Sequence, residues 1–250
     1  ELFGGYNIYH EPDDLAGYQK LPLFLRRAAA AVAKALPFQF RGKSFLIRGA
    51  QTIEENFIGN CSMFTMDEKR RLLREGLPCT RPQTLTKPIY DRVQGLDDVT
   101  KMQYLDINVW LVGDILLKAD RMSMANSLEL RVPFLDKEVF AVASKLPRRL
   151  RVNKENTKYA MRKAAMRHLP QATAQKKKLG FPVPTRVWLR EEKYYNMVRE
   201  AFESETAKQF FRTDALAAIL DEHYRGKRDN NRKIWTIYVF LIWYDIYFGG

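Results

Sequence analysis

The chain has 250 residues, of which 46% are hydrophobic and 28% charged, and its formal net charge is +13. This composition indicates a globular protein with a sizeable core. The two cysteines, Cys61 and Cys79, are too few for a disulfide framework and lack the spacing of a metal site, which favours a reducing compartment. The sequence shows neither a signal peptide nor an apolar run of the roughly 18 residues that span a bilayer. We therefore predict a cytoplasmic protein with no membrane partner.

The chain contains no Gly/Ser-rich linker or low-complexity tract, which favours a single domain over residues 1–250. Its positive charge is concentrated between Lys145 and Lys178, where twelve lysines and arginines stand against one acid, Glu155, and leave a net charge of +11. Such a field attracts a nucleoside triphosphate, pyrophosphate or nucleic acid, and a solvated basic face is the alternative. A specific nucleic-acid partner is disfavoured because the segment has no recognition-helix motif.

Helices are predicted in the first third of the chain. Residues 23–36, LFLRRAAAAVAKAL, combine alanine and leucine with an exposed stripe of basic side chains. Thr65 is expected to cap a second helix, with Glu68 as its capping-box partner and Gly76 as its end. Residues 78–88 are rich in proline, and we predict an irregular stretch there.

The middle of the chain shows helical spacing of apolar residues over positions 98–119. Gly113 is expected to break this pattern and to place Asp114 at the start of a new helix, where an acid can cap free N–H groups. A further helix, TKYAMRKAAMRHL, is expected to start at Asn153 or Asn156, with Lys158 in its first turn.

The last segment, residues 232–248 (RKIWTIYVFLIWYDIYF), is aromatic and apolar almost all round. It is shorter than the apolar stretch that a membrane-spanning helix needs, and it contains Lys233 and Asp245. We therefore predict a buried core helix.

Charged and apolar residues are most closely mixed in residues 114–136, DILLKADRMSMANSLELRVPFLD. Acids and bases interrupt an apolar helical pattern there. Charge inside such a pattern is costly unless it is paired or put to use. The functional candidates in this run are Asp114, Lys118, Asp120, Arg121, Glu129 and Arg131. The alternative is a helix whose charges are solvated or paired with one another.

This run resembles the signature of the synthetase domain of glutamine-dependent asparagine synthetases. Three further motifs follow the family's order around it: ELFGGY at residues 1–6, NTKYAMRKA at 156–164 and KKKLGFPVP at 176–184. Four ordered motifs make a specific match that covers nearly the whole chain. Related synthetases that form β-lactams or lasso peptides by adenylation share the motif core and are the alternative, although DRMSMANSLELRVPFLD favours asparagine formation.

The resemblance implies a mainly α chain, the helical C-terminal part of an α/β ATP-pyrophosphatase-type domain. The parallel sheet of that domain would lie mostly upstream of Glu1. The family's Ser-Gly-Gly-x-Asp-Ser phosphate loop, its Mg²⁺ ligands and its glutaminase domain are also expected upstream. We therefore expect the isolated chain to be inactive.

In the implied reaction, the side-chain carboxylate of aspartate attacks the α-phosphate of ATP, pyrophosphate leaves, and ammonia then displaces AMP. By resemblance the chain supplies catalytic lysines for the pyrophosphate charge, a substrate-binding set, and the edge of the nucleotide site, but no metal ligand. The catalytic lysines are Lys178 and Lys158. The substrate-binding set is Asp114, Arg131, Asp120 and Glu129. The edge of the nucleotide site consists of Glu1, Gly4 and Gly5.

The expected partners are aspartate, ATP with Mg²⁺, ammonia or glutamine, and the upstream half of the same protein; a homodimer is left open. Arg131 has the guanidinium fork that suits a substrate carboxylate. Its alternative role is an ion pair with Glu129 or Asp120 that fixes the loop before Pro133.

Overall fold

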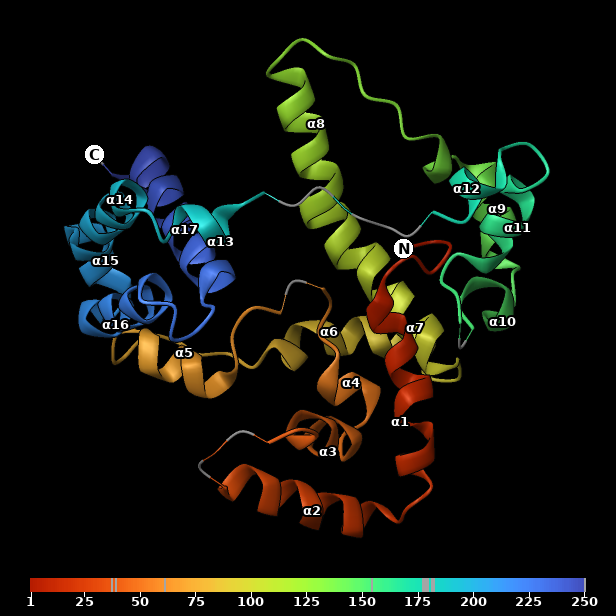
Figure 1. Cartoon of the computed structure of the whole chain (residues 1–250), viewed down its shortest axis with the longest axis horizontal. Coiled ribbons are helices and arrows are strands. Elements are labelled where there is room, and N and C mark those ends of the chain that lie inside the picture. The colour runs from red at the N-terminus through yellow and green to blue at the C-terminus, as the bar shows by residue number, and fades with distance from the viewer. Residues whose placement is uncertain are drawn as a thin grey trace. The chain divides into compact units, whose positions relative to one another are not determined.

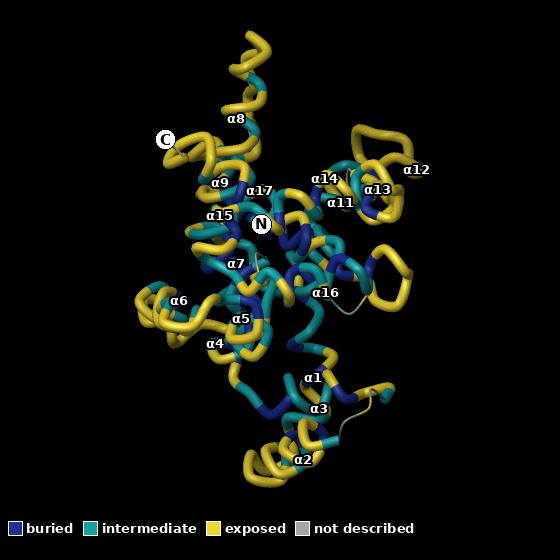
Figure 2. Tube along the Cα trace, turned by 90° about the vertical axis from the view of Figure 1, so that its left-hand side faces the viewer, coloured by how far each residue is buried: buried dark blue, intermediate teal, exposed yellow. Residues whose placement is uncertain are grey.

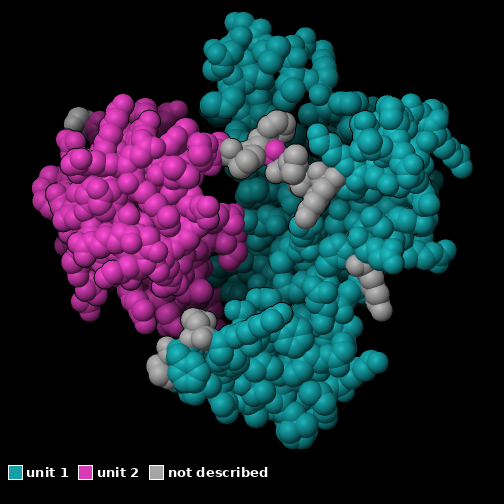
Figure 3. All heavy atoms as spheres, in the orientation of Figure 1, with its two compact units in different colours: residues 1–61, 82–177 teal, residues 62–81, 178–250 magenta. Residues whose placement is uncertain are grey.

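A computed structural model describes residues 1–36, 38, 40–60, 62–153, 155–176, 180 and 183–249. Over these residues the chain is helical, with no strand beyond an isolated antiparallel bridge between Leu73 and Phe211 (Figure 1). The predicted mainly helical chain is confirmed, and the sheet of the parent domain stays a prediction. The chain groups into two compact units, residues 1–61 with 82–177 (unit 1) and residues 62–81 with 178–250 (unit 2) (Figure 3).

Unit 1 is built from short helices, of which only some contribute to its buried core. Its elements are η1 (Asn7–His10), α1 (Glu11–Gln19), α2 (Leu23–Ala35), α3 (Lys43–Gly49), α4 (Ile53–Asn56), α6 (Pro82–Tyr90), η2 (Asp91–Val93), α7 (Asp98–Asp106), η3 (Ile107–Leu116), α8 (Leu117–Met124), η4 (Pro133–Leu135), α9 (Lys137–Ser144), α10 (Arg148–Arg151), α11 (Tyr159–Ala165) and α12 (Gln171–Ala174). Its core consists of Tyr9, Ile53, Phe57, Tyr90, Val93, Val99, Met102, Leu105 and Val152. Because Val152 shares this core with Tyr9, the basic segment is anchored beside the N-terminal segment.

Helix α2 confirms the helix predicted over residues 23–36. It buries only Ala30 and Ala33, so small side chains make its contact with the rest of unit 1, chiefly with α3. Helix α8 has no buried residue at all, and its tube is yellow and teal in Figure 2. Both helices therefore present most of their surface outward in this chain.

The predicted break at Gly113 is wrong. Helix α7 starts after Asp97, whose carboxylate accepts the N–H of Thr100 at 3.2 Å, and it continues through the π-helix η3 into α8. A glycine inside a helix costs only about 1 kcal/mol relative to alanine, which is too little to end a helix that is held on both sides. Asp114 therefore lies inside η3 and caps no helix.

The irregular stretch predicted over residues 78–88 is also wrong in part, because α6 begins at Pro82. Proline is well suited to the first helical position, where an N–H has no partner within the helix. Pro88 lies inside α6 and leaves one helical hydrogen bond unmade. The helix is held by packing instead: Tyr90 is buried, and its hydroxyl donates to the carbonyl of Phe57 at 2.7 Å.

Unit 2 combines one helix from the middle of the chain with the C-terminal helices. Its elements are α5 (Met66–Leu72), α13 (Thr185–Trp188), α14 (Glu192–Glu203), α15 (Glu205–Phe210), α16 (Thr213–Tyr224) and α17 (Asn231–Phe248). Its core consists of Leu72, Leu189, Val198, Phe202, Ala207, Leu216, Leu220, Ile234, Ile237 and Leu241.

Helix α5 begins as predicted, with the capping box between Thr65 and Glu68 formed in both directions. It ends at Leu72, earlier than the predicted stop at Gly76. The cause is tertiary, since the chain after Leu72 becomes extended and hydrogen-bonds to the end of α15 and the residues that follow it. There Arg74 N–H donates to the Phe210 carbonyl and Arg212 N–H to the Leu72 carbonyl, each at 2.9 Å.

Helix α17 is a core helix on one face only. Ile234, Ile237 and Leu241 are buried, whereas Ile246 is 70% exposed and Trp243 is 46% exposed. The prediction of a buried helix therefore holds for one stripe within unit 2. No helix in the described part of the chain is long and apolar enough to cross a membrane.

Candidate functional site

The N-terminal segment passes close to the loop that precedes α11. Gly4 has a φ of +66°, a conformation that favours glycine, and the side chain of Val152 occupies the space that a Cβ would need. The carbonyl of Gly4 accepts the backbone N–H of Lys158 at 3.3 Å. Only a glycine fits this position, because both the backbone conformation and the packing exclude a side chain.

Lys158 immediately precedes α11, so the prediction that it lies in the first turn is wrong. Its φ of 54° is left-handed, and it occupies the N-cap position. The stem of its side chain lies against Gly5, where an added Cβ would collide with the Lys158 Cε. The structure thus brings Gly4, Gly5 and Lys158 together.

Glu1 is held by a chain of hydrogen bonds. The Tyr6 hydroxyl donates to the Glu1 carboxylate at 2.8 Å, and the Trp110 indole N–H donates to the Tyr6 hydroxyl at 3.1 Å. Burial raises the pKa of Tyr6 to about 12, and the neighbouring Glu1 acts in the same direction. The tyrosine therefore stays protonated and fixes the first residue of the segment to η3.

Gln103 and Arg151 form a second attachment of the N-terminal segment to α7, which the sequence analysis did not predict. Gln103 is 2% exposed in α7, and its amide group donates to the carbonyls of Glu1 and Leu2. The Gln103 carbonyl accepts from Arg151 at 2.5 Å, and Arg151 also donates to the Thr100 hydroxyl at 2.6 Å. Burial lowers the pKa of Arg151. A glutamine at helical spacing among apolar core residues was the available signal.

Asp106 was missed as well. It is fully buried at the end of α7 and accepts hydrogen bonds from the Tyr9 hydroxyl at 2.7 Å and from the backbone and side chain of Asn60. Burial raises its pKa to about 6, although these hydrogen bonds oppose the shift. A lone acid in the apolar run YLDINVW was a visible sign of a buried polar junction.

Two of the predicted substrate-binding acids, Asp114 and Asp120, lie beyond Asp106 on the continuous helix that runs from α7 through η3 into α8. Asp114 makes a 3.4 Å ion pair with Lys118, and its side chain is 41% exposed. Asp120 is exposed on α8. In this structure Asp114 is therefore paired with a neighbouring base, which is the alternative interpretation of the charges in residues 114–136.

Glu129 and Arg131 pair with each other on the segment between α8 and η4, with side chains 72% and 83% exposed. Among the described residues no hydrogen bond or ion pair joins Arg131 to Asp114 or to Asp120. The structure thus gathers the predicted nucleotide edge with Lys158 but does not gather the substrate-binding set. Lys178 lies outside the described residues.

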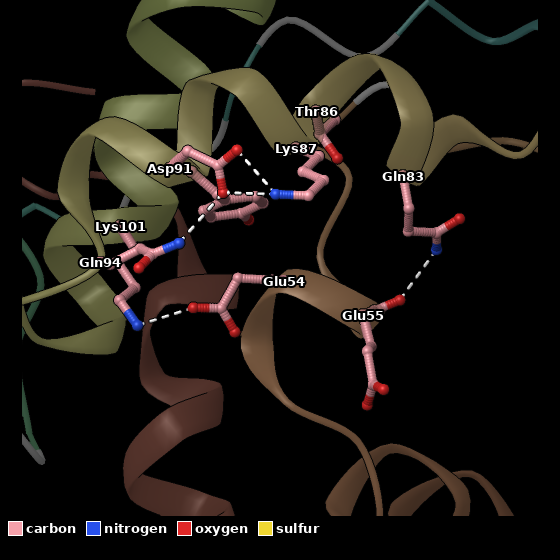
Figure 4. A pocket seen from close by; sticks show the side chains of 9 residues that line it. Glu54, Glu55, Gln83, Thr86, Lys87, Asp91, Gln94 and Lys101 are labelled. Atoms are coloured by element: carbon pink, nitrogen blue, oxygen red, sulfur yellow. Dashed lines mark hydrogen bonds and ion pairs between the residues drawn. The ribbon is translucent and has the colours of Figure 1, made fainter.

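Unit 1 also contains a pocket of about 500 Å³ between α4, α6 and α7, lined by residues with polar or charged groups (Figure 4). Its lining includes two ion pairs, Lys87 with Asp91 at 2.7 Å and Lys101 with Glu54 at 2.6 Å. Each lysine in this pocket thus has a carboxylate partner, and none of the predicted site residues lines it.

The described residues contain no group of three or more histidine, cysteine, aspartate or glutamate side chains that could hold a metal ion. The donor set that these residues offer therefore does not fit a metal centre.

Comparison with known proteins identifies the family. Residues 1–245 match the family model described as Asparagine synthase, and the chain belongs to this family. It is 45% identical to "Asparagine synthetase [glutamine-hydrolyzing] 1" of Bacillus subtilis over 98% of its length. It is also 45% identical to "Putative asparagine synthetase [glutamine-hydrolyzing]" of Mycobacterium tuberculosis over 99% of its length. The chain spans 39% and 38% of these two relatives. No solved structure matches it significantly.

Proposed function

We propose that this chain is part of a glutamine-dependent asparagine synthetase. The whole protein would adenylate the side-chain carboxylate of aspartate with ATP and transfer ammonia, released from glutamine, to give asparagine, AMP and pyrophosphate. The family match supports this reaction class. The observation that carries the proposal for this chain is the contact between the Gly4–Gly5 turn and Lys158, which joins two of the four family motifs.

In the proposed reaction, negative charge grows on the pyrophosphate leaving group as the aspartate carboxylate attacks. Fixed cations close to that charge lower the barrier because they need no reorganisation during the reaction. Lys158 suits this role, since its backbone is bonded to Gly4 and its stem is confined by Gly5. Lys178 is proposed as the second such cation on its motif match, three residues before Phe181.

Aspartate is proposed to bind through Asp114 and Arg131, with Asp120 and Glu129 as supporting acids. In this chain Arg131 is paired with Glu129, and both side chains are largely exposed. Exposed ion pairs are worth only about 0–1 kcal/mol. Arg131 can therefore exchange Glu129 for a substrate carboxylate at little cost, and Asp114 can likewise exchange Lys118 for the substrate ammonium.

ATP is proposed to act as its Mg²⁺ complex, in which the ion neutralises phosphate charge. No ligand to Mg²⁺ is assigned in the described part of this chain, because no suitable group of acids lies there. Toward ATP, the described residues of this chain are proposed to act through Lys158 and the segment that it contacts.

The test uses the whole protein that contains this chain. We expect aspartate to support exchange of labelled pyrophosphate into ATP, and we expect asparagine to form with ammonia or glutamine. Exchange with another carboxylate but not with aspartate would contradict the proposal and favour a β-lactam-type or lasso-peptide-type relative. The 250-residue chain alone is expected to show no exchange, because it contains no Ser-Gly-Gly-x-Asp-Ser phosphate loop.

A matched pair of variants tests the assignment of Lys178. Lys178→Ala is expected to slow pyrophosphate release about a hundredfold, whereas Lys177→Ala should stay within a few-fold of the parent. Equal losses would show that the lysine cluster acts through its summed charge.

A further inference from the structure

Unit 2 contains an apolar pocket that the proposed reaction does not use. Its volume is about 350 Å³, within the range of about 300–1,000 Å³ that is usual for small-ligand sites. Helix α5, the chain that follows it, and α17 form its walls. The lining residues are Phe64, Lys69, Leu72, Leu73, Pro78, Cys79, Thr80, Phe211, Thr236, Ile237 and Phe240.

The pocket has a well-fixed floor. Leu72 and Ile237 belong to the buried core of unit 2, and Phe211 and Phe240 pack against that core with their rings 5.9 Å apart. The bridge between Leu73 and Phe211 fixes the backbone on one side. The apolar surface is therefore preformed, and a ligand would not need to order it.

Among the described residues that line this pocket, Lys69 is the only charged one. It is partly buried, and its side chain makes no ion pair or hydrogen bond with any described residue. Other partly buried lysines differ: Lys233 pairs with Glu68, and Lys101 pairs with Glu54. A cation beside apolar surface and without a counter-ion is a favourable site for one negative charge.

We propose that this pocket binds an amphiphilic carboxylate, a molecule with a medium-length alkyl body and one carboxylate group. The alkyl body would occupy the surface formed by Leu72, Ile237 and Phe240, and the carboxylate would pair with Lys69. A neutral alkyl compound would lack the ion pair, and a multiply charged anion would find one cation, Lys69, among the described lining residues. In the pocket of unit 1, by contrast, Lys87 and Lys101 each already have a carboxylate partner (Figure 4).

Calorimetric titration of the 250-residue chain with dodecanoate tests the proposal, with dodecanol and dodecyltrimethylammonium as comparison ligands. We expect saturable binding of one dodecanoate and binding of the other two at least about tenfold weaker. Lys69→Met should reduce dodecanoate affinity about tenfold and leave dodecanol unchanged. Lys208→Met is the matched control, because Lys208 lies in unit 2 outside the pocket and pairs with Glu205. Its affinity should match that of the parent.

Cys79 gives a second, site-specific readout, because its free thiol lines the pocket. In a Cys61→Ser background, bound dodecanoate should slow alkylation of Cys79 at least several-fold, and Lys69→Met should remove this protection. Three results would overturn the proposal: no dodecanoate binding, binding that Lys69→Met leaves unchanged, or binding without protection of Cys79. None of these outcomes depends on asparagine synthesis, so they are separate from the test of the proposed function.

Discussion

The backbone N–H of Lys158 donates to the carbonyl of Gly4 at 3.3 Å, and the side chain of the same lysine covers Gly5. This double contact joins the first motif of the chain to the motif that opens α11. It fixes the left-handed backbone of Lys158 and confines the path of its side chain. The position of one proposed catalytic cation thus depends on two glycines that carry no functional group.

Gly5→Ala is expected to displace the Lys158 side chain, because the new Cβ would collide with Cε. A displaced catalytic group costs about a hundredfold in rate, so aspartate-dependent pyrophosphate exchange by the whole protein should fall by about that factor. Stability should change by less than about 1 kcal/mol, because the end of a lysine side chain can move aside at little cost.

Gly17→Ala is the control for Gly5→Ala. Gly17 lies in α1 with nothing near the position of a Cβ, so this change should preserve the rate and raise helix stability by up to about 1 kcal/mol. Equal rates for the Gly5 and Gly17 variants would show that the position of Lys158 does not matter.

Gln103→Leu is expected to destabilise unit 1 by about 2–3 kcal/mol. The change leaves Arg151 without one of its acceptors and the carbonyls of Glu1 and Leu2 without their buried donor. Urea denaturation measures the effect. Gln94→Leu removes an exposed glutamine bonded only to Asp91 and should cost less than about 0.5 kcal/mol. Similar losses of unfolding free energy in the two variants would show that the hydrogen bonds of Gln103 do not hold the N-terminal segment in place.

The raised pKa of Asp106 predicts that the unfolding free energy of the chain depends on pH. The folded pKa of this residue, about 6, lies above the ordinary value of 3.8, so the native state holds the proton more tightly than the unfolded state between those values. The contribution of this group to stability is therefore full at low pH and is lost as pH rises through the folded pKa. At 1.36 kcal/mol per pKa unit, the loss is about 3 kcal/mol.

Asp106→Asn removes this titration and keeps an oxygen that can accept from Tyr9. The unfolding free energy of the variant minus that of the parent should rise by up to about 3 kcal/mol between about pH 4 and pH 7. Denaturation curves across this range measure the difference directly. Parallel stability profiles would mean that Asp106 keeps an ordinary pKa in the folded chain.

Arg131→Ala separates binding from folding. The Arg131 side chain is 83% exposed, so stability should change by less than about 0.5 kcal/mol. In the whole protein the KM for aspartate should rise about tenfold or more. Arg131→Lys should not restore it, because an ammonium lacks the bidentate fork. Arg70→Ala, which removes another exposed ion pair, is the control and should leave the KM unchanged. An unaltered KM in Arg131→Ala would remove this residue from the aspartate site.

Features that depend on neighbouring residues could be predicted from the order of the amino acids. The capping box of Thr65 and Glu68 forms as predicted, because both partners lie within one turn of each other. Helix α2 also follows from its alanine-rich composition. The order of the four motifs indicated the family before any fold was described, and the family model confirms it.

Features that depend on distant partners became visible only in the folded chain. Helix α5 ends at Leu72 because the next residues bond to the end of α15 and the residues that follow it, and Gly113 continues a helix that its own propensity would weaken. Asp106 becomes a buried acceptor only when Tyr9 and Asn60 arrive beside it. Local propensities differ by about 1 kcal/mol or less per residue, whereas a buried polar group without a partner costs about 1–3 kcal/mol. Where the two compete, the distant contacts determine the backbone and the position of Lys158.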